Sequence, residues 1–173
     1  MSWPVTWTSE SPQETRTLAG RVAGLCRPGD VVLLVGDLGA GKTVFAQGFA
    51  AALGVPGPVT SPTFALVRQY HCGEGSPVGL LIHADVYRTG SLDEVVDLAL
   101  AELVEEDAVA LVEWGELAAP AFGDSALEIT LVAPDPVATP ERRTLTLAGR
   151  GRWAERSDAA DALDGAAATG ATS

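Results

Sequence analysis

The segment Gly36-Asp-Leu-Gly-Ala-Gly-Lys-Thr43 constrains this chain more than any other feature of its sequence. It follows the short apolar run 31–35 and precedes a stretch, 42–53, whose apolar residues lie on one helical face. Its glycines permit backbone angles that let successive N–H groups and a helix N-terminus surround phosphates. The sequence therefore predicts a strand, a phosphate-binding loop and a helix in succession.

The two residues that end this segment carry distinct roles. Lys42 would reach the β- and γ-phosphates of a nucleotide, and the hydroxyl of Thr43 would ligate Mg²⁺, a hard cation that binds oxygen. A chance glycine-rich turn is the alternative, which the flanking elements disfavour. The expected nucleotide-binding set includes the whole loop: Gly36, Asp37, Leu38, Gly39, Ala40, Gly41, Lys42 and Thr43.

A phosphate-binding loop also needs a carboxylate at the end of a buried strand, to hold the metal or its waters. Glu113 directly follows the apolar run 108–112, and Asp85 ends another strand-like segment. Both are candidate catalytic residues, together with Lys42. Both are also candidate Mg²⁺ ligands, together with Thr43. Glu113 could instead be a solvated strand end, and Asp85 a turn residue or a partner of Arg88.

Three further features have more than one interpretation. The segment 60–63 lies where switch segments sense a γ-phosphate, which makes Thr63 a candidate nucleotide-binding residue, although hydroxyl-rich segments with proline are often plain turns. His83 fits a hydrogen-bonded structural residue better than a general base, since no nucleophile motif accompanies it. Trp114 could stack on a base or a partner, or it could be a core aromatic.

The remaining pattern predicts an α/β domain over residues 1–150, with a mixed sheet covered by helices. From 151 to 173 the sequence is rich in Ala, Asp, Gly, Thr and Ser, which predicts a disordered tail. The other expected elements are helices over 12–26 and 91–104, a hairpin of strands over 63–70 and 78–86, a buried strand over 108–112, and half-exposed antiparallel strands around 127–131 and 145–147.

Composition limits the binding partners and the cellular compartment that are expected for the chain. Its formal charge of -12, from 11 basic and 23 acidic residues, disfavours direct binding of a nucleic-acid backbone. Two cysteines are too few for a disulfide framework. Neither a secretion signal nor a membrane-length apolar run occurs, so we expect a cytoplasmic protein without membrane contact.

Several segments together resemble one family. They are 36–43, Ser61-Pro-Thr-Phe64, His83-Ala-Asp-Val-Tyr-Arg88 and Val112-Glu-Trp114, and they look like TsaE, also called YjeE. The resemblance extends to about residue 148. It implies a three-layer P-loop NTPase-like fold with a mixed central sheet flanked by helices. It also implies ATP and Mg²⁺ as cofactors, and an ATPase that is slow without partners.

The family resemblance further implies a role in forming N6-threonylcarbamoyladenosine on tRNAs that read codons beginning with A. The partners would be TsaB and TsaD, with TsaD as the transferase and tRNA contacted only through the complex. Residue by residue, it gives Lys42 and Thr43 their phosphate and metal roles. It also supports Asp85, Glu113 and Trp114 as functional residues.

Two other functions stay open at the level of sequence. A small-molecule kinase can begin with the same strand, loop and helix. Such an enzyme usually needs a lid with arginines, whereas the segment 98–107 is acidic and has none. A nucleotide-dependent protein-binding switch is the second alternative. Phosphate release without an acceptor would separate an ATPase from a kinase.

Overall fold

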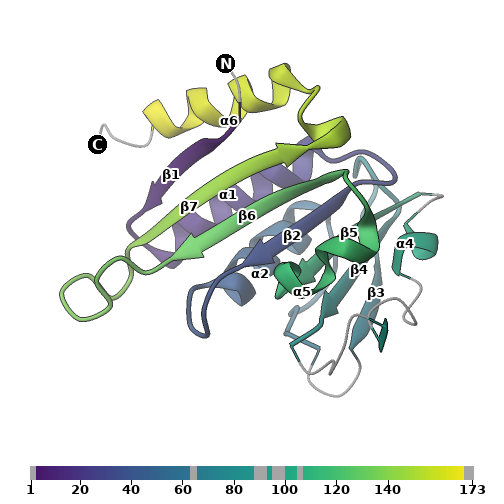
Figure 1. The fold of residues 1–173 in the computed structure, drawn as a ribbon, viewed down its shortest axis with the longest axis horizontal. Helices are drawn as coiled ribbons and strands as arrows, with labels where there is room; N and C mark the ends of the chain where they lie inside the picture. Colours follow the sequence, from purple (N-terminus) through teal and green to yellow (C-terminus); the bar gives the residue numbers. More distant parts are fainter. Residues whose placement is uncertain (1–2, 63–65, 88–92, 95–99, 105–106, 170–173) are drawn as a thin grey trace.

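The structure is a computed structural model that describes residues 3–62, 66–87, 93–94, 100–104 and 107–169. Within these ranges a seven-stranded sheet with the order β1-β7-β6-β2-β5-β4-β3 forms the centre of the molecule (Figure 1). The strands are β1 Val5–Ser9, β2 Val31–Val35, β3 Val67–His71, β4 Leu80–Asp85, β5 Ala108–Glu113, β6 Ala126–Val132 and β7 Arg143–Arg150.

The middle of the sheet is parallel and its edges are antiparallel. β2 pairs in parallel with β5 and β6, and β4 pairs in parallel with β5. β3 runs antiparallel to β4, as the predicted hairpin requires, and β7 runs antiparallel to β6 and β1. Because parallel strands end at the same edge, the residues that follow β2, β4 and β5 meet there.

Helices cover the two faces of the sheet. They are α1 Pro12–Leu25, α2 Lys42–Ala52, α4 Leu100–Leu103, α5 Gly115–Ala118 and α6 Ser157–Thr169, with the 3₁₀ helices η1 Ala119–Phe122 and η2 Gly151–Trp153. α1 and α2 pack together on one face, and α5 packs against β2 from the other (Figure 1). Gly48 lets α1 and α2 approach closely, since a Cβ there would lie 2.5 Å from Arg16 Cα. These layers confirm the predicted fold class.

The start of α1 is capped by side chains near Ser11, its N-cap residue. The hydroxyl of Ser11 accepts a hydrogen bond from the Glu14 N–H at 3.2 Å, and the Glu14 carboxylate accepts one from the Glu10 N–H at 2.8 Å. The first contact satisfies an N–H group that the helix itself leaves unpaired, and the second pairs the N–H of the residue before the N-cap. The second predicted helix is described only at 93–94 and 100–104, and α4 lies within the second of these ranges. The other residues of that predicted helix lie outside the described part.

The half-exposed strands expected near the C-terminal half are β6 and β7. Their inward side chains, such as Ile129 and Leu147, are fully buried, whereas the alternate positions Thr130 and Thr146 are partly exposed. β6 and β7 are antiparallel to one another, as predicted. The prediction was incomplete for β6, because its other edge pairs in parallel with β2.

The prediction of a disordered tail from 151 is wrong for residues 151–169, which form η2 and α6. Trp153 is fully buried, and the indole N–H of Trp7 donates to Leu163 O at 2.9 Å, so α6 is tied to β1 (Figure 1). This segment has few large apolar residues, which is why its composition predicts disorder. The small stripe of Ala159, Ala160 and Leu163 is nevertheless buried against the core.

β1 is a further element that the sequence analysis did not predict. Its burial alternates, with Val5 and Trp7 inside and Thr6 and Thr8 exposed. It pairs with β7 along its whole length, so it forms the edge strand that α6 covers. In the part of the chain that the structure describes, no helix is both long and apolar enough to cross a membrane.

Candidate active site

The phosphate-binding loop takes the shape that its glycines allow. Gly36 leaves β2 with φ 153°, and a Cβ there would lie 2.5 Å from Leu131 O on the neighbouring strand. Gly41 has φ 104° and caps the N-terminus of α2. Side chains at these two positions would collide with the backbone or strain it. The loop therefore brings its backbone N–H groups and the positive end of α2 to one point.

Lys42 is buried within this loop. Its ammonium donates hydrogen bonds to Gly36 O and, at 2.9 Å, to Asp37 O, and it lies 3.9 Å from the centroid of a Trp114 ring. Burial lowers the pKa of the Lys42 amine, and the negative charge of Glu113 is the largest opposing effect. A cation held in this way is available to the oxygens of a phosphate beside the loop.

Trp114 is positioned by an unusual backbone conformation. It adopts φ 60° and ψ 45°, the left-handed region that bulky residues rarely occupy. This conformation follows β5 directly and turns the indole toward Lys42. The ring also stacks on Tyr87, with centroids 4.5 Å apart. The structure thus places Trp114 at the edge of the site, where a role in stacking on a base or a partner stays a prediction.

A chain of hydrogen bonds joins the loop to β5. Thr43 Oγ1 lies 2.9 Å from Ser61 Oγ, which in turn lies 3.0 Å from Glu113 Oε1 and 3.2 Å from Oε2. Glu113 is 2% exposed, so the interpretation of this residue as a solvated strand end is wrong. Three oxygen-bearing side chains from distant parts of the sequence therefore meet beside the loop.

Ser61 is a site residue that was not among the expected nucleotide or metal contacts. It belongs to the hydroxyl-rich segment that the sequence marks as a possible switch, but Thr63 was the residue expected to bind the nucleotide. Thr63 lies outside the described residues, so its role stays a prediction. The available signal for Ser61 was its hydroxyl immediately before Pro62, and only the folded chain brings that hydroxyl between Thr43 and Glu113.

His83 contacts the carboxylate of Glu113. It is fully buried in β4, and its Nε2 lies 2.9 Å from Glu113 Oε1. Its Nδ1 has no hydrogen-bond partner among the described residues. Its predicted character as a hydrogen-bonded structural residue is confirmed, and its partner is the carboxylate of the candidate site.

Asp85 ends β4 directly beside Glu113, with which it is paired in the parallel register. Its Oδ1 accepts a hydrogen bond from the Tyr87 N–H at 3.0 Å, so it does form a turn, as one interpretation expected. Partial burial raises the pKa of the Asp85 carboxyl; the Tyr87 hydrogen bond opposes this effect and the charge of Glu113 adds to it. Asp85 also lines the cavity beside the loop.

These residues surround a cavity of about 500 Å³. That volume lies within the range of nucleotide-sized sites. Among the expected residues, the cavity is lined by Leu38, Gly39, Gly41, Lys42, Thr43, Asp85, Glu113 and Trp114. Gly36, Asp37 and Ala40 line a neighbouring depression on the other side of the loop, together with Leu38 and Gly39. The structure therefore brings together all the described site candidates around one loop.

The donor chemistry of the site fits Mg²⁺. Hydroxyl and carboxylate oxygens are the ligands that this cation takes, and Thr43 and Glu113 supply them on either side of Ser61, which lies within hydrogen-bond distance of both. No group of three His, Cys, Asp or Glu side chains suited to a metal occurs within the described ranges. A magnesium ion at this site would therefore rely on hydroxyls, waters and phosphate oxygens beside one or two carboxylates.

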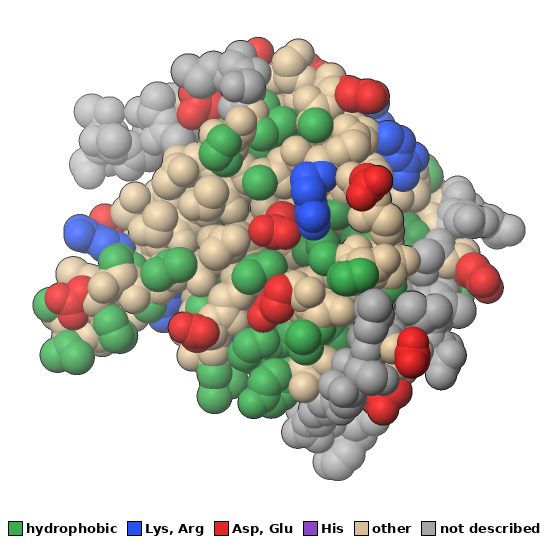
Figure 2. Space-filling model, in the orientation of Figure 1, with side chains coloured by type: hydrophobic (Ala, Val, Ile, Leu, Met, Phe, Trp, Pro, Cys, Tyr) green, Lys and Arg blue, Asp and Glu red, His purple; other side chains and the backbone are tan. Residues whose placement is uncertain are grey.

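The face drawn in Figure 2 agrees with the charge of the chain. On the face drawn in Figure 2, the visible Lys and Arg side chains are scattered among acidic ones and form no continuous basic patch in the described part. With a formal charge of -12, such a surface gives little support for binding a nucleic-acid backbone directly.

Comparisons with known proteins agree on one family. Residues 9–143 match the family described as "Threonylcarbamoyl adenosine biosynthesis protein TsaE". The "tRNA threonylcarbamoyladenosine biosynthesis protein TsaE" of Bacillus subtilis is 42% identical over 125 residues, 72% of this chain and 75% of that protein. The protein of the same name from Streptomyces coelicolor is 42% identical over 142 residues, 80% of this chain and 93% of that protein.

A solved structure extends the comparison to three dimensions. The crystal structure of Bacillus subtilis YdiB superposes with a TM-score of 0.70 at 32% sequence identity, over 96% of this chain and 97% of that one. The match covers the sheet and the phosphate-binding loop that carry the site. From the loop, the chain of hydrogen bonds beside it and these relatives, we conclude that the chain belongs to the TsaE family of P-loop proteins.

Proposed function

We propose that this chain binds and hydrolyses ATP with Mg²⁺, as a component of N6-threonylcarbamoyladenosine formation on tRNAs that read codons beginning with A. The observation that carries the proposal is the hydrogen-bonded series Thr43, Ser61 and Glu113 beside the only lysine of the chain. The same groups are those that a P-loop ATPase needs for phosphates, metal and water.

Each described residue of the site has a part in this proposal. The N–H groups of 36–43 and the Lys42 ammonium bind the phosphates, and Thr43 and Glu113 hold Mg²⁺, with Asp85 beside them. Mg²⁺ supplies positive charge that offsets charge on the phosphate oxygens. Ser61 and His83 fix the Glu113 carboxylate in place, so it can order a water or the metal without reorganisation.

The biological setting rests on the relatives. Their printed names place them in tRNA threonylcarbamoyladenosine biosynthesis. We extend this role to the present chain and propose that it acts in the cytoplasm on a complex of TsaB and TsaD, with TsaD transferring the group. A net charge of -12 is compatible with tRNA being held by the partners. We expect turnover by the isolated chain to be slow.

The proposal is tested by threonylcarbamoylation of tRNA over many turnovers with TsaB and TsaD from the same source, measured together with phosphate release. Sustained modification and phosphate release that both require the intact chain would support the whole proposal. If phosphate is released but tRNA modification proceeds equally well without the chain, the proposed ATPase activity would stand and the proposed role in tRNA modification would not. If neither activity is found but phosphate is transferred to a small acceptor, the result would favour a small-molecule kinase.

Replacing Glu113 with glutamine is expected to lower the rate of phosphate release about 10- to 100-fold. Glutamine keeps the volume and can still contact Ser61 and His83, but it lacks the charge that holds a metal or orients water. Binding of ADP, measured by calorimetry in the absence of metal, should stay within about threefold, which is a small effect on the free-energy scale.

The matched control is Glu128→Gln. Glu128 lies on β6 in a partly exposed ion pair with Arg150, with a 3.2 Å contact outside the cavity. Its replacement should leave both phosphate release and ADP binding unchanged. Full activity of Glu113→Gln, or an equal loss in the two variants, would rule out the proposed role of Glu113.

A further inference from the structure

Arg143 reaches the phosphate-binding loop from a distant strand. It is the first residue of β7, and its Nε donates to Ala40 O at 2.9 Å while its NH2 group donates to Gly39 O at 3.2 Å. The NH1 group donates to Pro140 O at 2.7 Å and to Arg142 O at 2.8 Å. One guanidinium thus ties the β6–β7 connection to the middle of the loop.

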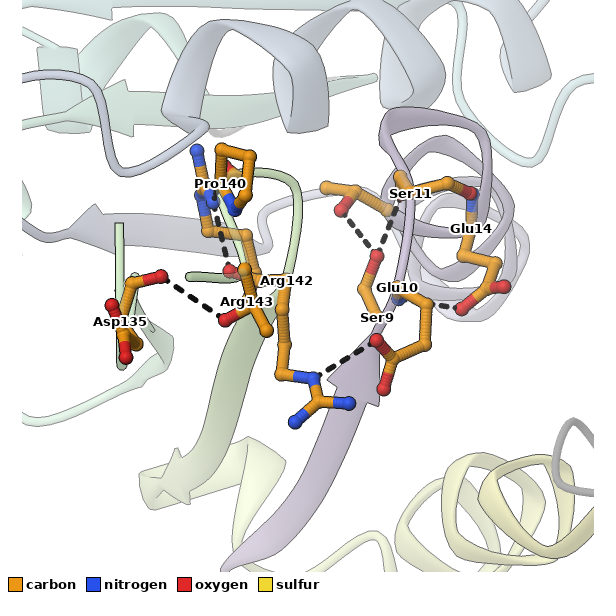
Figure 3. Close-up of polar contacts among 10 residues, drawn as sticks. Ser9, Glu10, Ser11, Glu14, Asp135, Pro140, Arg142 and Arg143 are labelled. Carbon is orange, nitrogen blue, oxygen red and sulfur yellow. Dashed lines mark hydrogen bonds and ion pairs between the residues drawn. The ribbon is translucent and has the colours of Figure 1, made fainter. Parts of the chain in front are cut away.

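The neighbouring arginine behaves differently. Arg142 is about half exposed, and its Nε donates to the Glu10 carboxylate at 2.9 Å. Figure 3 shows the Arg142 guanidinium at Glu10 and the Arg143 side chain beside Pro140, so adjacent residues serve opposite sides of the strand. Among the described residues, no carboxylate pairs with Arg143. Within the described ranges, the hydrogen-bond partners of its guanidinium are carbonyl oxygens in the loop and in the β6–β7 connection.

The two loop carbonyls that Arg143 binds fix the direction of the peptide groups. In a planar trans peptide the C=O and the N–H point to opposite sides. Because Ala40 O faces Arg143, the N–H of Gly41 in the same peptide points away from the guanidinium. Within the described ranges the structure gives this N–H no backbone acceptor, whereas the Ala40 N–H donates to Asp37 O at 3.0 Å.

Gly41 also packs against the guanidinium. A Cβ at Gly41 would lie 3.7 Å from Arg143 Nε, so the arginine supports the loop at the residue that caps α2. The N–H of Gly41 and those of the first turn of α2 are the donors that a phosphate meets at the end of such a loop. The planar fork of a guanidinium holds two carbonyls in a fixed relative direction, whereas an ammonium on a flexible stem sets no such direction.

We propose that Arg143 is a positioning residue for the phosphate-binding loop: it holds the carbonyls of Gly39 and Ala40 on one side, so that the Gly41 N–H faces the β-phosphate of a bound nucleotide. The inference rests on the proposed binding of adenine nucleotides and adds a residue from β7 to that function. It assigns the arginine to the phosphates rather than to the base, because both of its loop contacts lie at 39–40.

The test compares the Kd values of ADP and AMP for the wild type, Arg143→Ala and Arg143→Lys, using competition against a fluorescent ADP analogue. Arg143→Ala should weaken ADP binding about tenfold or more, since it removes two charge-assisted hydrogen bonds. Binding of AMP, which lacks the β-phosphate, should weaken by less than about threefold. Arg143→Lys should fall between the wild type and Arg143→Ala for ADP, because charge without the fork restores only part of the geometry.

Arg150→Ala is the matched control, because Arg150 lies at the other end of β7 and pairs with Glu128. It should bind both nucleotides like the wild type. Unchanged ADP binding by Arg143→Ala, wild-type affinity of Arg143→Lys, or a parallel loss of ADP and AMP would each overturn the proposal. A wild type that binds no ADP would instead overturn the proposed function, so the two failures are distinguishable. Circular dichroism and thermal unfolding without nucleotide verify that each variant is folded.

Discussion

Replacing Lys42 with alanine is expected to weaken ATP binding and to lower phosphate release by about 10²- to 10³-fold. The Lys42 ammonium is buried at the loop and would be the side-chain cation nearest to the β- and γ-phosphates. Alanine removes its charge from a site where carboxylates would otherwise repel phosphate oxygens. Calorimetry with ADP and a phosphate-release assay at saturating ATP would separate the effect on binding from that on turnover.

A second readout follows from the composition. Lys42 is the only lysine among 173 residues, so an amine-acylating reagent can modify only this side chain and the N-terminus. Bound ADP should protect the peptide that carries Lys42 in a mass-spectrometric analysis. Arg68→Ala, which removes an exposed cation from β3, is the control and should leave both readouts unchanged. Normal hydrolysis by Lys42→Ala, or acylation indifferent to ADP, would contradict the role of Lys42.

Replacing Arg156 with alanine is expected to lower the free energy of unfolding by about 3–5 kcal/mol. The guanidinium of Arg156 binds the Asp30 carboxylate through two hydrogen bonds of 2.7 and 2.8 Å, and Asp30 is only 1% exposed. It also lies over the ring of Trp153, 4.5 Å from its centroid. Alanine would leave the carboxylate buried without its cation and loosen the attachment of α6. Urea unfolding followed by circular dichroism measures the loss.

Two comparisons make this prediction specific. Arg150→Ala breaks an exposed ion pair and should cost less than about 1 kcal/mol. Adding Asp30→Asn to Arg156→Ala should recover part of the lost stability, because the uncompensated charge is then removed. An unfolding free energy of Arg156→Ala within 1 kcal/mol of the wild type would show that the segment after β7 contributes little to the fold.

The predicted nucleotide site depended on residues that are close together in the sequence. The loop 36–43 combines its glycines, its lysine and its hydroxyl within one segment, and the apolar run before it specifies a buried strand. The position of Glu113 was predictable for a related reason, since a parallel strand delivers its last residue to the same edge of the sheet. Such features are local, so a sequence alone can express them.

The contacts within the site were not predictable in this way. Ser61 contacts Glu113 across 52 positions of sequence, and Arg143 contacts Ala40 across 103. Nothing in the local pattern around Ser61 or Arg143 specifies these partners, because they depend on the strand order of the sheet. His83 illustrates the same limit: its character as a hydrogen-bonded structural residue was predictable from sequence, whereas its partner, Glu113, was not.

The error at the C-terminus has a related physical cause. A composition of small residues was taken to offer too little apolar surface for folding, yet Trp153, Ala159, Ala160 and Leu163 suffice to pack this segment against the core. The sequence by itself determined the loop chemistry, the main strands and the first two helices, because propensities, caps and glycine geometry act over a few residues. Only the tertiary structure decided which distant groups meet Glu113, how Arg143 reaches the loop and that α6 belongs to the core, because those contacts require the whole sheet to be assembled.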